Sequence, residues 1–389
     1  MRPLLGTLLT GLLAIGLMTP AHAEDTIKIG VIIPLTGPFT STGLEIQGAT
    51  RLYMKQHGDT VAGKKIELII RDDGGVPDTT KRIATEMVVK EHVAVIAGMG
   101  LTPLALAVAP IVTKAKIPLV IMGAATSTIP SASPFIVRTS FAVPQGIAIF
   151  GEWAASTGLK TIVTLVADYA PGIDTEIWFK KSFEAAGGKV VESIRVPLAN
   201  PDFAPFLQRA ADAHADALFA FVPSGQGGVF ARQFNERGLA KTGMKLLATG
   251  DVLDEQLLDT LGENVVGLQS IYHYSDQHDS ALNKTFVTNF KADNGIRPNM
   301  MAVGGYDGMA LIYQALAKTN GDTDGEKLIE AMKGTNWESP RGPVSIDPNT
   351  REIVQNEYLR KVERLPDGTL GNIEQKTFPN IKDPGKTAN

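Results

Sequence analysis

Apolar residues follow two alternating patterns along the chain. Short apolar runs, typical of buried strands, lie at 27–33, 65–71, 93–97, 117–122, 135–139, 161–166, 189–197, 217–222 and 245–248. Stretches with apolar positions three or four residues apart, typical of amphipathic helices, lie at 45–57, 77–90, 104–115, 145–156, 172–186, 203–213, 230–238 and 253–261. Strands that alternate with helices of this length predict parallel sheets joined by helical crossovers.

The alternation forms two series, which predicts two similar lobes. One series ends near residue 139 and the next begins near residue 145. Helices at 280–294, 301–319 and 324–333 and strands at 342–347 and 357–362 follow, and we expect them to return to the first lobe. Periodicity alone does not assign each of these segments to a lobe. A chain of 389 residues exceeds what one hydrophobic core supports, so we predict an α/β protein with two Rossmann-like lobes.

Residues 1–23 have the features of an export signal. A basic start at 1–2 precedes an apolar stretch at 4–18 that is too short for a comfortable membrane span. An Ala-x-Ala pattern then ends at Ala23, so we predict cleavage after Ala23 and a protein that is soluble in the periplasm. The chain has no cysteine, which excludes a disulfide and a lipid on an N-terminal Cys.

Charge and motif content argue against several other classes of protein. The formal net charge is −4 and basic residues form no run, so we expect no nucleic-acid partner. The histidines show no zinc-ligand spacing, and neither a phosphate-binding loop nor a nucleophile elbow is complete. We therefore expect a protein that is not an enzyme and that uses no metal and no cofactor.

The run Gly123-Ala124-Ala125-Thr126-Ser127 is the strongest candidate for chemistry. It follows an apolar strand, so it predicts a tight turn at the edge of a parallel sheet. Such a turn exposes backbone N–H groups and hydroxyls, which suits a small anion such as a carboxylate. The alternative is that Thr126, like Thr102, is an ordinary helix cap.

Several further runs together carry a family resemblance. They are Gly30–Pro38, Gly43 with Gly48-Ala49, Asp72-Asp73, Leu106-Ala107 with Pro110-Ile111, Arg138-Thr139-Ser140, Gly304–Gly308 and Gly342-Pro343-Val344. In their order and spacing the chain resembles the branched-chain amino-acid binding proteins of bacterial ABC importers, which have the type I periplasmic binding fold.

The resemblance implies two lobes joined by three hinge crossings, with a ligand bound between them. It places one lobe at 24–143 plus 273–349 and the other at 144–272 plus 350–389. The crossings are expected at 142–145, 271–274 and 349–351. The partners implied are a small carboxylate ligand and an inner-membrane permease with its ATPase, and the protein is expected to be a monomer.

The resemblance also implies roles for individual residues. Thr102, Ala124, Ala125 and Thr126 match the positions that hold the ligand carboxylate. Tyr169 matches a tyrosine that closes over the ligand from the other lobe, although it could be a plain loop residue.

The loop from Ser224 to Gly228 follows a strand, and its glycines permit close backbone approach to a ligand. Ser224 and Gln226 are therefore candidate contacts, with an ordinary helix-leading turn as the alternative. Asp251 matches an acid that pairs with a ligand ammonium, but an Asp at such a turn is also a common N-cap.

Two departures from the family pattern affect the ligand. Thr42 stands where relatives that bind aliphatic amino acids often carry an aromatic residue, and Asp251 is shorter than the usual Glu. Both changes favour a larger ligand. We expect a hydrophobic amino acid, with an aromatic acid such as a benzoate, hydroxybenzoate or cinnamate as the alternative, for which Asp251 or Gln226 would bond a ring hydroxyl. A ligand sensor or an envelope enzyme is the alternative from another class.

Overall fold

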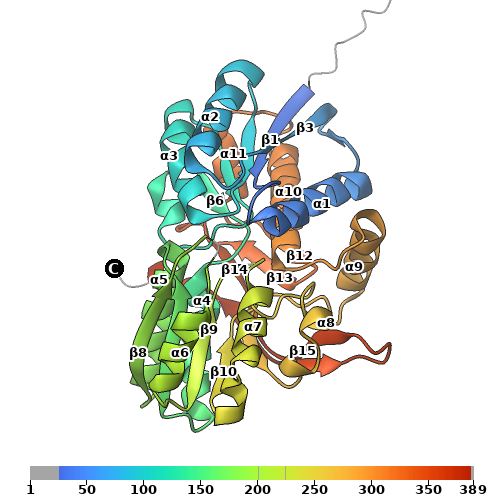
Figure 1. The fold of residues 1–389 in the computed structure, drawn as a ribbon. Coiled ribbons are helices and arrows are strands. Elements are labelled where there is room, and N and C mark those ends of the chain that lie inside the picture. The colour runs from blue at the N-terminus through green and yellow to red at the C-terminus, as the bar shows by residue number, and fades with distance from the viewer. Residues whose placement is uncertain (1–25, 200, 224, 387–389) are drawn as a thin grey trace, which may run out of the picture.

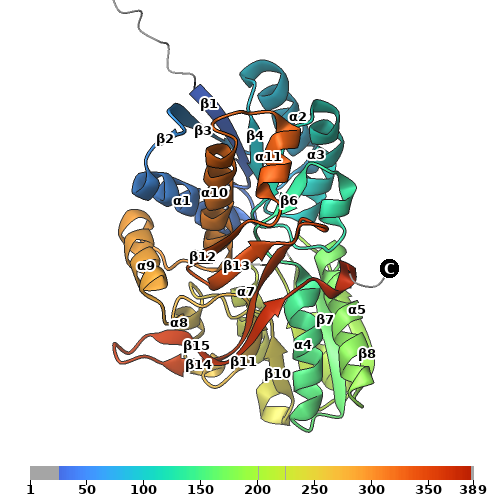
Figure 2. The ribbon, with the colours of Figure 1, turned by 180° about the vertical axis from the view of Figure 1, so that it is seen from behind.

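The computed structural model describes residues 26–199, 201–223 and 225–386. The chain forms two lobes, one above the other in Figure 1, and Figure 2 shows the strands that run between them from behind. Each lobe is a parallel sheet with helices against it, so the predicted α/β class with two lobes is confirmed. The proposed export signal lies outside the described residues. No described helix has the length and apolar character needed to cross a membrane.

The first lobe is built on a sheet in the order β2-β3-β1-β4-β5-β6. Every neighbouring pair is parallel except the short β2–β3 hairpin. The strands are β1 (Thr26–Ile33), β2 (Thr60–Val61), β3 (Lys64–Asp72), β4 (Val95–Gly98), β5 (Leu119–Ile121) and β6 (Ile136–Arg138). Because β1 lies between β3 and β4 and is covered on both faces, its sequence is a nearly continuous apolar run, interrupted only by Lys28.

Six longer helices and two short ones belong to this lobe among the described residues. They are α1 (Thr40–His57), α2 (Pro77–Glu86), the π-helix η1 (Met87–Glu91), α3 (Thr102–Ala115), the 3₁₀ helix η2 (Ile129–Ala132), α9 (Ala281–Asn294), α10 (Met300–Lys318) and α11 (Gly325–Met332). The late helix α10 packs along α1, as Figure 1 shows in orange and blue. The return of these helices to the first lobe is therefore as expected.

The second lobe has a sheet in the order β10-β9-β7-β8, and all its pairs are parallel. Its strands are β7 (Thr161–Ala167), β8 (Lys189–Val196), β9 (Ala217–Phe221) and β10 (Lys245–Ala248). Its helices are α4 (Val143–Ser156), α5 (Ala170–Ala185), α6 (Ala204–Asp212), α7 (Gly227–Glu236), η3 (Leu239–Thr242), α8 (Leu258–Leu261) and η4 (Gly262–Val265). The helix expected at 253–261 is thus only α8, because 253–257 is irregular.

A third, antiparallel sheet lies between and below the lobes. Strands were expected at 342–347 and 357–362, but they pair within this sheet and not with the sheet of the first lobe, as had been expected. The order of the antiparallel sheet is β11-β14-β13-β12, with β15 added to β14. The strands are β11 (Gln269–Tyr272), β12 (Asn336–Ser339), β13 (Gly342–Ile346), β14 (Ile353–Arg364) and β15 (Leu370–Ile381), after which η5 (Pro384–Lys386) ends the described chain. The first lobe sheet ends at β6 and the second begins at β7, but the exact lobe limits and crossings stay predictions.

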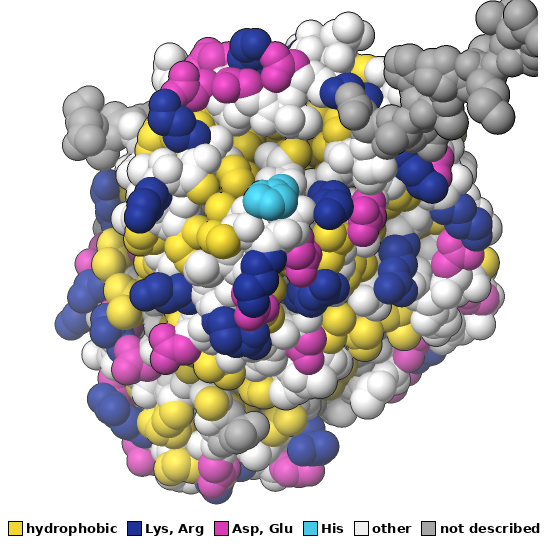
Figure 3. Space-filling view, turned by 90° about the horizontal axis from the view of Figure 1, so that it is seen from above, with side chains coloured by type: hydrophobic (Ala, Val, Ile, Leu, Met, Phe, Trp, Pro, Cys, Tyr) yellow, Lys and Arg dark blue, Asp and Glu magenta, His cyan; other side chains and the backbone are white. Residues whose placement is uncertain are grey.

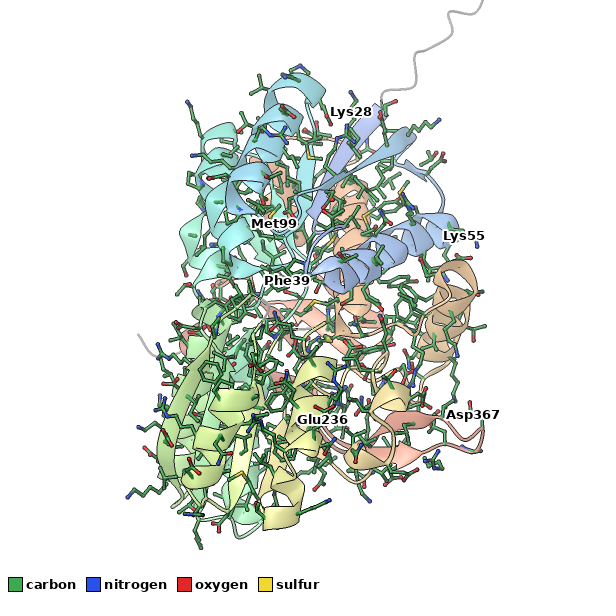
Figure 4. All side chains as sticks on the ribbon, in the orientation of Figure 1. Lys28, Phe39, Lys55, Met99, Glu236 and Asp367 are labelled. Atoms are coloured by element: carbon green, nitrogen blue, oxygen red, sulfur yellow. The ribbon has the colours of Figure 1, made fainter. Side chains whose placement is uncertain are left out.

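Charged side chains are mixed on the upper face of the molecule. Figure 3 shows Lys and Arg side chains interspersed with Asp and Glu, with apolar patches between them. Figure 4 shows Phe39, which precedes α1, at the end of the first lobe that faces the second. The second lobe therefore faces the N-terminal ends of α1 and α3 and the nearby strand ends of the first sheet.

Candidate functional site

A cavity of about 350 Å³, including some open solvent, lies between the two lobes. The residues that line it are Thr42, Gly100, Leu101, Thr102, Gly123, Ala124, Ala125, Phe141 and Met301 on one side and Tyr169, Pro171, Phe221, Pro223 and Asp251 on the other. The structure thus brings together six of the nine residues expected from the sequence.

Thr102 lines the first-lobe end of the cavity, and Thr126, which does not line it, lies directly behind the Thr102 hydroxyl. Thr102 Oγ1 and Thr126 Oγ1 are 2.9 Å apart, and their residues are 1% and 4% exposed. Thr102 begins α3, whose N-cap is Leu101 and has no side-chain cap bond. Neither threonine therefore caps a helix, which was the alternative interpretation of the sequence. When one hydroxyl donates to the other, the second keeps its own hydrogen for another acceptor.

The turn at 123–127 presents its backbone N–H groups in a fixed direction. The carbonyl of Ala124 accepts from Arg138 Nη1 at 3.1 Å, and the carbonyl of Thr126 accepts from Arg138 Nη2 at 2.8 Å. The carbonyl of Ala125 accepts from the N–H of Val143 at 3.0 Å. The N–H groups of Ala125 and Thr126 donate to no acceptor among the described residues. The turn therefore offers two backbone donors and a hydroxyl, as a carboxylate requires.

Arg138 supports this turn and was not among the site residues expected from the sequence. It is fully buried, and its Nε and Nη2 each lie 2.7 Å from a carboxylate oxygen of Glu352. Burial raises the pKa of Glu352, while the guanidinium acts to lower it. The pair is neutral overall, so Arg138 can organise the turn without adding net charge to the cavity. Its place in the Arg138-Thr139-Ser140 motif was visible in the sequence, but its contact with residues 14 and 12 positions earlier was not.

Tight packing of two glycines brings this turn close to the start of α3. A Cβ atom at Gly123 would lie 3.0 Å from Gly100 Cα and 3.2 Å from the Met99 carbonyl. Any side chain at Gly123 would push these two segments apart. The glycines therefore hold the Thr102 hydroxyl beside the N–H groups of the turn.

The second lobe contributes an aromatic wall and a carboxylate. Tyr169 precedes α5 and stacks on Phe221, with ring centroids 6.2 Å apart and planes at 17°. Burial and then the charge of Asp251 raise the pKa of Tyr169 well above its ordinary value. Asp251 is 3% exposed, and its Oδ2 accepts from Tyr272 Oη at 2.8 Å and from Thr249 Oγ1 at 3.3 Å. Asp251 is thus a positioned acceptor at the far end of the cavity.

The other residues expected at the site differ in whether they line the cavity. Thr42 lines the cavity from α1 and is 2% exposed. Gln226 does not line it: its Nε2 donates to the Leu198 carbonyl at 2.6 Å, and its Oε1 has no partner among the described residues. Ser224 lies outside the described residues. The aromatic walls formed by Phe141 and Phe221 were not predicted, because apolar residues beside a strand end carry no local signal.

Single hydrogen bonds join the lobes beside the cavity. Ser127 N–H donates to Asp174 Oδ2 at 3.2 Å, and Asn299 Nδ2 donates to Asp254 Oδ2 at 2.7 Å. Both bonds run from the first lobe to the second, so the structure is a closed form. Within the described ranges, no group of three His, Cys, Asp or Glu side chains is placed to hold a metal ion.

Two α/β lobes that enclose a cavity with polar groups at both ends define a class of ligand receptors. Comparison with known proteins identifies the family. A family model described as periplasmic binding protein matches residues 26–369. The chain belongs to this family and is a solute-binding protein of the ABC-transporter type, as the resemblance implied.

Solved structures and curated relatives agree on this class. A solute-binding protein of an ABC transporter from Rhodopseudomonas palustris BisB5, solved with 3,4-dihydroxybenzoic acid, is 57% identical with a TM-score of 0.91 and covers 93% of this chain and 100% of its own. One from Rhodopseudomonas palustris HaA2, solved with p-hydroxybenzoic acid, is 43% identical with a TM-score of 0.89 and covers 93% and 99%. The Leu/Ile/Val-binding protein homolog 6 of Brucella melitensis is 43% identical, with 98% of each chain covered.

Proposed function

We propose that this receptor binds an aromatic carboxylic acid of the hydroxybenzoate type and delivers it to a membrane permease. The observation that carries this proposal is the difference between the polar groups at the two ends of the cavity. One end offers uncharged donors, the middle is walled by Phe141, Phe221 and Tyr169, and the other end holds the Asp251 carboxylate. The two similar proteins solved with hydroxylated benzoic acids support the same reading.

The ligand would lie along this axis. Its carboxylate would accept from the Thr102 hydroxyl and from the N–H groups of Ala125 and Thr126. Its ring would pack between the aromatic walls, where flat apolar surface is removed from water. A ring hydroxyl would donate to Asp251, forming a charge-assisted bond in a buried site. Each end of the ligand would therefore contact a different lobe, which favours the closed form.

A hydrophobic amino acid is the second candidate. Asp251 could pair with an ammonium group, and curated relatives carry the name Leu/Ile/Val-binding protein. Against this, Thr42 leaves room that a bulkier side chain would fill, which suits a wider, flat ligand better.

The proposed transport role also includes export of the chain and contact with membrane partners. We infer that residues 1–23 direct export and are removed after Ala23, and that the mature protein acts as a periplasmic monomer. The closed, liganded form would engage the inner-membrane permease and its ATPase. We propose a receptor that does not transform its ligand and that binds no nucleic acid.

A ligand panel tests the proposal. Residues 24–389 would be unfolded and refolded to remove carried ligand, and melting temperatures measured with benzoate, 4-hydroxybenzoate, 3,4-dihydroxybenzoate, leucine, isoleucine and valine. A ligand that binds only the folded state raises the melting temperature. Stabilisation by the hydroxybenzoates supports the proposal, and recovery of the unchanged acid after incubation supports a receptor without catalysis. Stabilisation by the amino acids alone would refute the aromatic ligand.

A further inference from the structure

Phe141 differs from the other two aromatic walls of the ligand cavity in the part of the chain that carries it. Tyr169 and Phe221 come from the second lobe, where Tyr169 precedes α5 and Phe221 ends β9. Phe141 lies in the segment that leads from β6 of the first lobe to α4. A role as flat apolar surface alone makes no use of this difference.

The backbone around Phe141 is bonded to the turn that offers the carboxylate donors. Ser140 Oγ donates to the Ala124 carbonyl at 3.1 Å, and the Val143 N–H donates to the Ala125 carbonyl at 3.0 Å. Both bonds join buried residues, so water does not compete for them. We therefore expect Phe141 to keep its place relative to the carboxylate donors when the second lobe moves.

The ring of Phe141 is supported from behind by two further rings. It stacks on His273 with centroids 4.7 Å apart and planes at 26°, and its centroid lies 5.4 Å from that of Tyr272. Tyr272 is itself held, because its Oη donates to Asp251 at 2.8 Å. The space that these three rings line behind the cavity has room for about one water molecule. The Phe141 ring can therefore yield little space to a ligand that presses on it.

We propose that Phe141 is a specificity-determining residue that limits the ligand to acids of the size of a hydroxybenzoate. A ring with a larger side group, or with a carbon spacer before its carboxylate, needs space that the Phe141 ring occupies. This inference rests on the proposed function and makes it narrower, because it excludes methoxylated benzoates and cinnamates. One methylene too many in an apolar pocket changes affinity by about 10- to 200-fold.

The wild-type protein provides the first test. Titration calorimetry would compare 4-hydroxybenzoate with two larger acids, 4-hydroxy-3-methoxybenzoate and 4-hydroxycinnamate. We expect each larger acid to bind about 10- to 200-fold more weakly. A larger acid that binds as tightly as 4-hydroxybenzoate would overturn the size limit. If none of the three acids binds, the proposed function itself fails.

A substitution provides the second test. Phe141→Ala removes the ring and joins the ligand cavity to the space behind it, because Phe141 lines both. The preference for 4-hydroxybenzoate over at least one of the larger acids is then expected to fall by about tenfold or more. An unchanged preference for 4-hydroxybenzoate over both acids would show that Phe141 only covers the ligand.

Phe290→Ala is the matched control. Phe290 is fully buried in α9 and lines neither space, so its variant should keep the wild-type preference. Its melting temperature gives the cost of losing a buried ring away from the ligand. If Phe141→Ala does not fold, Phe141→Leu replaces it and should lower the preference by a smaller factor. A wild-type preference in Phe141→Leu would then overturn the proposal.

Discussion

The substitution Thr102→Val tests the carboxylate end of the site most directly. Valine has nearly the shape of threonine, so the start of α3 is preserved while one hydroxyl is lost. That hydroxyl lies 2.9 Å from Thr126 Oγ1 and lines the cavity. A hydrogen bond to a charged group contributes about 1.5–3 kcal/mol, which corresponds to about 10- to 150-fold in Kd. We expect a loss of this size for 4-hydroxybenzoate, measured by titration calorimetry near neutral pH.

Thr50→Val is the matched control for this substitution. Thr50 is also fully buried, but its hydroxyl donates at 2.9 Å to the Gln47 carbonyl within α1, away from the cavity. Its affinity for the ligand should match the wild type, and its melting temperature gives the cost of losing one buried hydroxyl. Wild-type affinity in Thr102→Val, or the same loss in both variants, would refute the assignment of the carboxylate site.

Three further predictions follow from contacts near the cavity. Thr126→Val should weaken binding by about 2- to 10-fold, less than Thr102→Val, and calorimetry of the double variant should show a less than additive loss. Burial raises the pKa of Asp254 from 3.8 to about 6, so closure over this carboxyl favours its protonated form. Affinity should therefore fall as pH rises from about 4 to 6.5, and Asp254→Asn should reduce this trend in the same titrations, leaving the part that is due to the neighbouring Glu255. Arg138→Met should lower stability in urea unfolding by about 3–5 kcal/mol because Glu352 is left unpaired, and adding Glu352→Met should recover stability but not ligand binding.

The parallel part of the fold could be predicted because its signals are local. A nearly continuous apolar run such as 27–33 is what a strand covered on both faces requires, and the helices between such runs are amphipathic. The candidate donors on Thr102 and on the turn at 124–126 could be placed for the same reason, since each follows directly after such a strand. Proximity to a strand end is readable from sequence.

The antiparallel sheet could be predicted only in part: strands at 342–347 and 357–362 carried a local signal, but their pairing and the last strand did not. β15 (Leu370–Ile381) is exposed over much of its length and takes its conformation from pairing with β14. The expected helix over 253–261 was wrong in its first half for a related reason. Asp254 and Glu255 there bond Asn299 and Arg360, which are distant in sequence. Tertiary bonds of this kind override local helical spacing.

The closed form can open because the hydrogen bonds across the cleft are weak, whereas the buried ion pairs elsewhere are strong. Three buried arginine–carboxylate pairs lie near the segments that we expect to connect the lobes: Arg138–Glu352, Arg341–Asp307 and Arg360–Glu255, at 2.7, 2.7 and 2.9 Å. Separating such a pair would cost about 3–5 kcal/mol, so we expect these contacts to persist as the lobes move. The bonds across the cleft, from Ser127 to Asp174 and from Asn299 to Asp254, are single and contribute about 0.5–1.5 kcal/mol each. A ligand that bonds both lobes adds a comparable amount to the closed form alone, which is enough to shift the population.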